Sequence, residues 1–395
     1  MTRGFNRWVV LLQVFLATTI GMMGFAAPFP LLPVWIQELG LTKAQGGLIN
    51  GLWYLPGIAV ALPAGWAFDR YPARRLMLAC WTLIVAGAAI MAIARSYPIL
   101  CAGRLLLSIG MNAHMVGAPK VVGNWFAGRR ELGLAMGLYT LAFTAGVFLA
   151  LNVLGSIAES GGSHPALRVL AALSVAGFLI MAIVPEPPAA SETDRAIAVG
   201  GFRPRQLGLG AWILALGYFG YSIGSDAYLA FTPDFLVGRG LPLATASATV
   251  GSYAVVAFVL KPILSSFLTR ERAILYVCGA ATTGLLAIGL LFVSLPPVSS
   301  ASVLGVSLAL GMPAFYALPS FLLPASQAGQ GYGLYQLFGS LGFLAQPLVG
   351  AVVDGTGTYA MGFTVIAVYI GLGFVVLLPA VQLLDRAPLP SAKTG

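Results

Sequence analysis

The chain has 395 residues, of which 59% are hydrophobic and only 8% are charged, and its formal net charge is +9. A soluble domain carries about 25% charged residues, so this chain lacks the charge to cover a water-facing surface, and intrinsic disorder is excluded because it requires low hydrophobicity and high charge. The composition therefore predicts a polytopic membrane protein.

Apolar stretches long enough to cross a bilayer as helices, which takes about 20 residues, follow one another along the chain. They cover residues 8–33, 44–67, 76–94, 98–122, 133–156, 166–184, 208–234, 243–267, 273–295, 299–323, 333–353 and 360–384. None shows the alternation of apolar and polar residues that marks a β-barrel strand. The first stretch is too long for a signal-peptide core and no cleavage site follows it, so we expect it to be retained. The chain is predicted to be an all-α membrane protein with twelve transmembrane helices.

The loop after the second span reads GWAFDRYPARR at residues 65–75 and concentrates charge in a chain that has little of it. Gly65 lets a neighbouring helix approach closely. Asp69 lies at a helix end, where it can pair with a guanidinium group or accept from exposed helix-terminal N–H groups. The basic residues Arg70, Arg74 and Arg75 either anchor the topology or join Asp69 in a clasp that holds one state of a moving protein closed.

This loop resembles the signature of the major facilitator superfamily, in which a glycine is followed four residues later by an aspartate and then by basic residues. Pro72 departs from the pattern, because the family usually has glycine there. Further stretches are similar to the family: GRLLLSIGMNA at 103–113, NWFAGRRELGLAMG at 124–137 and PLVGAVVDGTGTY at 347–359. The resemblance implies two pseudo-symmetric six-helix bundles and transport by alternating access. The fifth span lacks the proline signature of the family's drug exporters, so the chain is more similar to the cyanate, nitrate and organic-anion carriers.

The most polar interior stretch, residues 186–207, contains consecutive prolines and reads as a solvated linker. It divides the chain into an N-terminal six-helix bundle at 1–185 and a C-terminal six-helix bundle at 208–395. The two parts repeat each other: GLYTLAFTAG at 137–146 matches GLYQLFGSLG at 333–342, and PVWIQELGLT at 33–42 matches PDFLVGRGLP at 233–242. Both offsets are close to half the chain length, which indicates an internal duplication.

Basic residues between the spans set the orientation through the positive-inside rule. If both termini are cytoplasmic, the cytoplasmic basic residues are Arg3, Arg7, Arg70, Arg74, Arg75, Arg129, Arg130, Arg195, Arg203, Arg205, Arg270, Arg272, Arg386 and Lys393. The opposite side then has only Lys43, Arg95, Arg168 and Arg239. We therefore predict a multi-pass protein with both termini in the cytoplasm, and the composition and short loops favour a bacterial inner membrane.

Three polar residues share one face of the fourth span. At 100° per residue, Arg104, Asn112 and Lys120 fall within less than half of the helix circumference. Inserting an ionisable side chain into the membrane costs about 2.5–3.5 kcal/mol, so such residues usually have a function. This face is therefore predicted to line a substrate pathway. Lys120 lies near the cytoplasmic end and could instead extend to the membrane surface.

The C-terminal half contributes two further charged candidates. Lys261, next to Pro262 in the eighth span, is predicted either to bind an anion or to form an ion pair. Asp226 in the seventh span is the candidate proton-coupling residue, and the alternative is a pairing with a helix dipole or a hydroxyl group. We expect the two to lie on the order of 10 Å apart in depth. Tyr221 and Gln336 complete the predicted substrate pathway, and Trp53, Tyr54 and Tyr218 either line it or serve as packing residues.

The remaining motifs exclude other classes of protein. The three cysteines lack CxxC spacing and there are two histidines, so no metal site is expected. A phosphate-binding GxxxxGK[ST] loop is missing from the sequence, as are the common intramembrane catalytic motifs. We expect a non-enzymatic monomer without cofactor or nucleic-acid partner, in contact with a small solute and the lipid bilayer.

Within the spans the basic residues outnumber the acidic ones. The family resemblance implies a secondary transporter, and this charge balance favours a small anionic or zwitterionic solute, carried in symport with protons. Two alternatives remain open at this level: an exporter of lipophilic or drug-like compounds, and a membrane sensor that does not transport.

Overall fold

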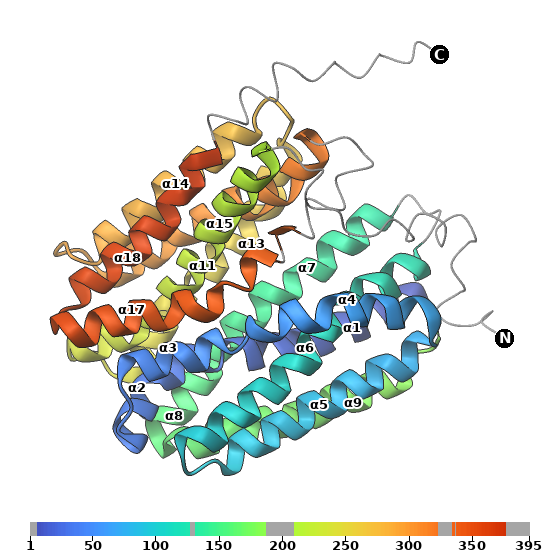
Figure 1. Cartoon of the computed structure of the whole chain (residues 1–395), viewed down its shortest axis with the longest axis horizontal. Coiled ribbons are helices and arrows are strands. Elements are labelled where there is room, and N and C mark those ends of the chain that lie inside the picture. The colour runs from blue at the N-terminus through green and yellow to red at the C-terminus, as the bar shows by residue number, and fades with distance from the viewer. Residues whose placement is uncertain (1–5, 127–130, 187–208, 323–333, 336, 377–395) are drawn as a thin grey trace.

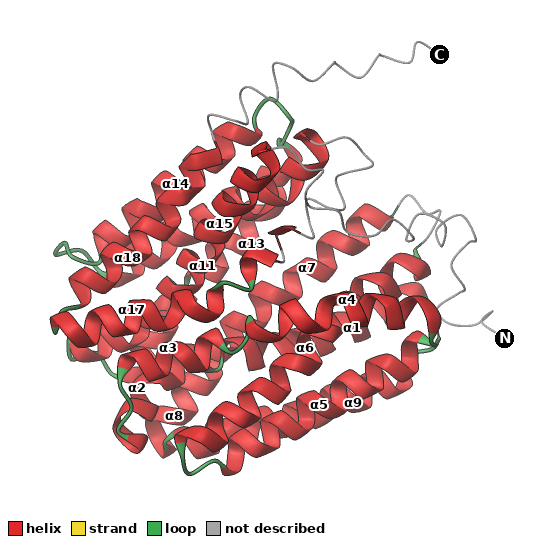
Figure 2. Cartoon of the chain, viewed as in Figure 1, coloured by secondary structure: helices red, strands yellow, loops and turns green. Residues whose placement is uncertain are grey.

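The computed structural model describes residues 6–126, 131–186, 209–322, 334–335 and 337–376, and all regular structure within them is helical (Figure 2). Ten helices or runs of helices in this part are long and apolar enough to cross a membrane. The second and seventh predicted spans, which are richer in polar residues and glycine, also fold as helices. The predicted all-α membrane fold is confirmed. Nearly all of the predicted linker and Gln336 lie outside the described residues.

Several spans of the N-terminal half are built from two consecutive helices. The first span is α1 (Arg7–Ala26) and α2 (Pro28–Leu39), the second is α3 (Lys43–Gly51) and α4 (Leu55–Arg70), the third is α5 (Ala73–Ile93) and the fourth is α6 (Tyr97–Trp125). The fifth span is α7 (Leu132–Leu149), the π-helical turn η1 (Ala150–Leu154) and α8 (Gly155–Gly161), and the sixth is α9 (Ser163–Ile183).

The C-terminal half follows the same plan. The seventh span is α11 (Leu209–Gly238), the eighth is α12 (Leu243–Gly251) with α13 (Tyr253–Ser266), the ninth is α14 (Ala273–Leu290) and the tenth is α15 (Pro297–Leu322). The eleventh span ends in α17 (Gly342–Thr356), and the twelfth is α18 (Tyr359–Gly371) with the 3₁₀ turn η3 (Leu372–Val376).

The helices pack as two bundles that meet mainly at one end of the molecule (Figure 1). One bundle is held by contacts of α5 with α6 and α9 and of α1 with α7, and the other by contacts of α15 with α13 and α14 and of α11 with α18. The bundles contact each other through α3 and α17, α2 and α11, and α8 and α12. We call the end that holds the starts of α3 and α12 and the ends of α8 and α17 the convergent end; it lies at the lower left of Figure 1.

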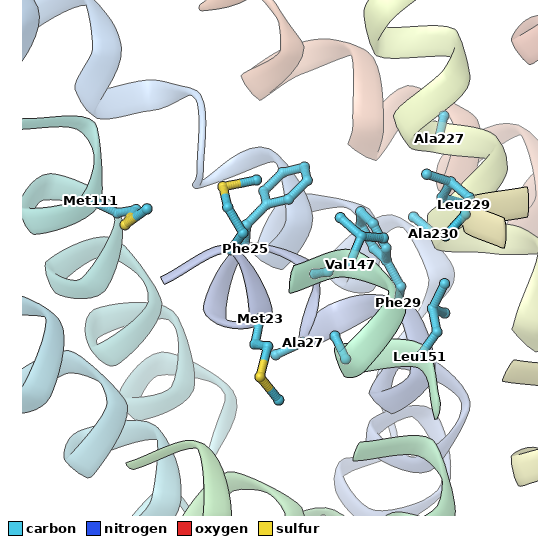
Figure 3. Close-up of a cluster of buried hydrophobic side chains, with 14 of the residues drawn as sticks. Met23, Phe25, Ala27, Phe29, Met111, Val147, Leu151, Ala227, Leu229 and Ala230 are labelled. Atoms are coloured by element: carbon cyan, nitrogen blue, oxygen red, sulfur yellow. The ribbon is translucent and has the colours of Figure 1, made fainter. Parts of the chain in front are cut away.

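The two bundles share a core where α1 gives way to α2 (Figure 3). Phe25 and Phe29 from the first span pack edge to face, with their ring centroids 5.3 Å apart. Val147 and Leu151 from the fifth span and Leu229 from α11 are buried in the same cluster. Apolar side chains from both halves therefore meet near the middle of the molecule.

Small residues bring α6 against α5. A Cβ atom added at Gly87 would lie 2.4 Å from the backbone nitrogen of Leu107, and one added at Gly110 would lie 2.5 Å from the carbonyl oxygen of Cys80. No side chain fits in this space, so the two backbones are in direct contact, as glycine allows between membrane helices. This contact fixes the position of α6, which carries Arg104.

Arg104 donates hydrogen bonds to backbone carbonyl groups near the points where the first two spans are interrupted. Pro28 has no N–H to donate to the carbonyl of Gly24, four residues earlier. The Arg104 side chain, which is 0% exposed, donates from Nη1 to Gly24 at 2.5 Å and from Nη2 to Phe25 at 2.9 Å. Its Nε donates to the carbonyl of Ile49 at 3.2 Å, next to the break between α3 and α4. One side chain therefore ties the first, second and fourth spans together.

The same face of α6 supplies two further donors to the second span. Asn112 donates from Nδ2 to the carbonyl of Trp53 at 3.0 Å, in the break between α3 and α4. Lys120 donates from Nζ to the carbonyl of Phe68 at 2.8 Å, in the last turn of α4. The polar face of α6 is thus turned toward backbone groups of its neighbours.

We expect Arg104→Ala to lower the free energy of unfolding by about 3 kcal/mol or more, because it leaves three buried carbonyl groups without their donor. Thermal unfolding of the purified protein in lipid nanodiscs measures this loss. Arg95→Ala is the matched control, since Arg95 lies two residues before α6 and is exposed. A melting temperature for Arg104→Ala equal to that of Arg95→Ala would contradict the structural role.

Candidate functional site

A hydrogen bond between the two halves lies at the centre of the candidate site. Tyr54, in the turn between α3 and α4, donates from its hydroxyl to Oδ2 of Asp226 on α11 at 2.5 Å. Both residues are half-buried. No described residue forms an ion pair with Asp226. The carboxyl group of Asp226 therefore depends on a neutral donor from the opposite half.

The fold places Tyr54 at this position through a close contact with the eleventh span. A Cβ atom added at Gly342, the first residue of α17, would lie 2.8 Å from Cδ2 of Tyr54 and 2.7 Å from Cδ1 of Ile223. The absence of a side chain at Gly342 thus makes room for the Tyr54 ring beside α11. Tyr54 is held by packing from one span and by a hydrogen bond from another.

Aromatic residues continue from this point along α11. The rings of Tyr218 and Tyr335 stack with centroids 4.4 Å apart and an angle of 11° between their planes. The hydroxyl groups of Tyr218 and Tyr316 lie 3.1 Å apart, and Tyr316 is 52% exposed. Tyr221 differs, because it is fully buried and donates to the carbonyl of Ser307 at 2.7 Å. The Tyr218 and Tyr316 hydroxyl groups thus contact each other about two turns before Asp226 on α11, whereas Tyr221 packs inside the C-terminal bundle.

Lys261 lies on the protein-facing side of α13. It follows Ala254 and Ala257, both buried, by seven and four residues, which places the three on one face of the helix. The opposite face carries the exposed residues Val255 and Val259. Among the described residues, no hydrogen-bond or ion-pair partner contacts the Lys261 amine. Lys261 thus lies on an inward-turned face of a membrane helix, and no residue that the structure describes neutralises its amine.

The predicted pathway residues of α6 are engaged with the backbone. Arg104, Asn112 and Lys120 do share one face, but each donates to carbonyl groups of the first or second span. Arg104 is shielded from solvent on every side. The structure therefore brings Tyr54 and Asp226 together and leaves Lys261 apart from them, and it uses the three α6 residues to hold the helices in place.

The charged stretch at 65–75, which the sequence predicts to be a loop, forms the end of α4, the two linking residues Tyr71 and Pro72, and the start of α5. The start of α5 is tied to the end of α9. The guanidinium group of Arg74 donates to the carbonyl of Ala182. Glu186 accepts from the backbone N–H groups of Ala73 at 2.6 Å and Arg74 at 3.1 Å, so its negative charge caps the positive end of α5. Glu186 follows the sixth span directly, and sequence analysis missed its role because the partner is distant in the chain.

Other members of the predicted gating motif are less constrained. Arg70 places its guanidinium carbon 4.5 Å from the centre of the Trp66 ring, and Arg70 and Arg75 are both exposed. Gly65 and Asp69 belong to α4, and the structure describes their backbone but not the contacts of their side-chain positions. The clasp that the sequence suggests around Asp69 stays a prediction.

A cavity of about 290 Å³ lies elsewhere, within the N-terminal half. Its lining includes Glu38 from the end of α2, Arg95 from the loop before α6 and His164 from the start of α9. Glu38 is already bonded to the backbone N–H of Ser163 at 3.0 Å. Within the part of the chain that the structure describes, no group of three His, Cys, Asp or Glu side chains is arranged to hold a metal ion.

Sequence analysis also missed a group of contacts at the convergent end. Lys43 at the start of α3 forms an ion pair with Asp234 of α11, with Nζ and Oδ2 2.6 Å apart. The hydroxyl of Tyr359 contacts both side chains. The sequence places Lys43 among the charges between the spans, and no local pattern indicates a partner 191 residues away.

Comparison with known families gives a match over most of the chain. The family model described as Major Facilitator Superfamily matches residues 14–347.

Individual relatives are distant but cover most of the chain. A lysosomal dipeptide transporter of Danio rerio is 24% identical over 82% of this chain and 75% of its own. The nitrite extrusion protein of Bacillus subtilis (strain 168) is 24% identical over 86% of both chains. A probable nitrate transporter of Staphylococcus haemolyticus (strain JCSC1435) is 23% identical over 92% of this chain and 94% of its own.

Solved structures share the fold at low sequence identity. A bacterial homolog of the human lysosomal transporter Spinster, in an inward-facing and unoccupied conformation, superimposes with a TM-score of 0.77 at 17% identity, over 98% of this chain and 100% of the other. A D-xylose–proton symporter gives a TM-score of 0.75 at 14% identity, over 96% and 98% of the two chains. These likenesses show the fold.

Proposed function

The chain belongs to the Major Facilitator Superfamily, and from that premise we propose that it moves a small anionic or zwitterionic solute together with a proton. Relatives over most of its length are named as transporters of nitrite, nitrate and dipeptides. The chain is thus a secondary transporter in a membrane and not an enzyme. We further propose that it works as a monomer in a bacterial inner membrane, with both termini in the cytoplasm, as the distribution of basic residues predicts.

The observation that carries the proposal for the solute is Lys261. A charged amine within a membrane helix is costly unless something neutralises it, and no described residue pairs with Lys261. Its position on the protein-facing side of α13 keeps it away from lipid. A carboxylate, nitrate or sulfonate group of a bound solute would supply the missing negative charge and form charge-assisted hydrogen bonds.

Arg104 does not compete for this role in the conformation seen here. Its three donor nitrogens each contact a backbone carbonyl, and the side chain is completely buried. The case for an anionic group on the solute therefore rests on Lys261, and Arg104 acts on transport by holding the spans that carry Tyr54.

Asp226 supports the proposed proton coupling. As a carboxylate it accepts the hydrogen bond from Tyr54 at 2.5 Å, and as a neutral acid it loses much of its strength as an acceptor. Because Tyr54 and Asp226 belong to different halves, protonation changes a contact between the parts that must move relative to each other. A proton taken up at Asp226 would in this way bias the equilibrium between transport states.

The separation of Asp226 and Lys261 also suits a solute with both charges. Asp226 lies on α11 and Lys261 on α13, so the two charged groups come from different helices of the C-terminal half. A zwitterion could direct its cationic group to Asp226 and its anionic group toward Lys261. The dipeptide transporter among the relatives is named for such a solute.

A second candidate, the exporter of lipophilic compounds, is favoured by one observation. Tyr218, whose ring stacks on that of Tyr335, precedes Asp226 by about two turns on α11, and aromatic faces near an acid are suited to lipophilic cations. A thermal-stability screen separates the candidates, because a ligand that binds the folded state raises the melting temperature. Stabilisation by nitrate, sulfoacetate or dialanine supports our proposal, and stabilisation by tetraphenylphosphonium alone supports the exporter.

We expect Lys261→Met to reduce kcat/KM for the stabilising anion at least tenfold in proteoliposomes, mainly through a higher KM, because the counter-charge for the anion is lost. Lys261→Arg, which keeps the charge, should retain more of the activity. The matched control is Arg95→Met, which removes an exposed basic residue. Transport of the anion at the wild-type rate by Lys261→Met would refute the anion-binding role.

We expect Asp226→Asn to abolish accumulation driven by a proton gradient while solute exchange across the membrane continues, because the variant can bind the solute but cannot carry the proton. The two assays use the same proteoliposomes, with and without a pH gradient. Glu38→Gln is the control, since the Glu38 carboxylate is bonded within its own half. Gradient-driven accumulation that survives in Asp226→Asn would place proton coupling at another group.

A further inference from the structure

At the convergent end, α3 of the N-terminal half lies directly against α17 of the C-terminal half. A Cβ atom added at Gly47 would lie 2.5 Å from the carbonyl oxygen of Gln346, and one added at Gly350 would lie 2.2 Å from that of Lys43. The backbones are therefore in contact along this interface. Asn50 donates to Gln346 across it at 3.2 Å. No side chain fits at Gly47 or Gly350 while this end stays closed.

A carboxylate of the C-terminal half caps the start of α3. Asp354, near the end of α17, accepts from the backbone N–H of Lys43 at 3.0 Å and from that of Ala44 at 2.8 Å. These N–H groups belong to the first turn of the helix and have no partner within it. A negative charge at this position is also stabilised by the helix dipole.

The same contact occurs a second time with the halves exchanged. Glu159, near the end of α8 in the N-terminal half, accepts from the backbone N–H of Ala244 at 3.2 Å, in the first turn of α12 of the C-terminal half. Ala44 and Ala244 lie 200 residues apart, which is the offset of the internal repeat at 33–42 and 233–242. Each half thus offers one helix start and one carboxylate to the other.

An ion pair lies beside the first of these contacts. Lys43 and Asp234 join α3 to α11 at 2.6 Å, with side-chain exposures of 23% and 9%. Tyr359, at the start of α18, contacts both side chains through its hydroxyl. The ion pair is more shielded from water than the two caps, since Asp354 and Glu159 are exposed.

We propose that Asp354 on α3, Glu159 on α12 and the Lys43–Asp234 pair form one latch, which holds the convergent end closed and breaks as a unit when this end opens. All three contacts cross between the halves, and all lie at the same end. A relative rotation of the halves that separates α3 from α17 must also separate α8 from α12. The positive-inside prediction assigns this end to the outer face, so the latch stabilises the state that is closed to the outside.

The chemistry of the latch suits reversible opening. Water can replace the exposed carboxylate contacts at little cost, because charge–dipole interactions at a helix end are worth little in solvent and are screened by salt. Solvent likewise takes over the Lys43 amine and the Asp234 carboxylate once the halves part. The latch therefore shifts the equilibrium toward the state in which the convergent end is closed, and this end can still open.

The test measures the distance across the convergent end in the absence of any solute. Spin labels at Gln37→Cys and Gly355→Cys, both exposed positions on opposite halves, report this distance by electron–electron double resonance after the native cysteines are replaced. We expect Asp354→Asn, Glu159→Gln and Lys43→Met each to raise the ratio of the long to the short distance about three- to tenfold, and the combined variant to raise it further. The charge exchange Lys43→Asp with Asp234→Lys should return the ratio toward the wild-type value.

Two control variants remove charges at the same end whose partners lie within their own half. Glu38→Gln removes the carboxylate bonded to Ser163, and Arg239→Met removes the donor to the carbonyl of Leu291. Neither should change the distance distribution. The proposal is overturned if the latch variants leave the distribution unchanged, including the case in which they only lower the melting temperature, or if the controls shift it equally. Because no solute is present, these outcomes do not depend on the identity of the transported anion.

Discussion

The rest of the structure depends on one constraint: the backbone carbonyl groups at the breaks in the first two spans need hydrogen-bond donors from elsewhere in the protein. An unpaired backbone carbonyl within a membrane costs several kcal/mol, and Pro28 leaves the carbonyl of Gly24 without its helical partner. Arg104 donates to this group and to two others. Its position is set in turn by the glycine-mediated contact between α5 and α6. The break in the second span, stabilised in this way, places Tyr54 beside Asp226.

The few charged residues within the spans fall into two groups, one that holds the helices together and one that we assign to transport. Arg104 and Lys120 bond to backbone carbonyls, so the cost of placing them in the membrane is offset by the groups they satisfy. Asp226 and Lys261 differ, because the first has only a neutral donor and the second has no partner among the described residues. These two incompletely satisfied groups are the ones that we propose bind a proton and a solute.

The internal repeat is kept at the convergent end and broken at the candidate site. At the convergent end the symmetry is kept, since Asp354 caps α3 and Glu159 caps α12 in equivalent ways. At the candidate site it is broken, because Asp226 corresponds to Ala26 at the offset of 200 residues. Matching contacts suit two similar bodies that rotate against each other, whereas a single carboxyl group suits the transfer of one proton. In our proposal, duplication accounts for the movement of the halves, and the divergence of one half accounts for the proton coupling.

The sequence by itself determined the membrane class, the helical spans and the family, because apolar length, charge distribution and the 65–75 loop are local properties of the chain. It also placed Arg104, Asn112 and Lys120 on one face of a helix, since helical periodicity is local. Only the tertiary structure decided that this face meets backbone carbonyls, that Tyr54 bonds to Asp226 and that Lys43 pairs with Asp234. These contacts join residues from 52 to 191 positions apart, and the side-chain partners of a charge depend on which helices pack together, which no local pattern specifies.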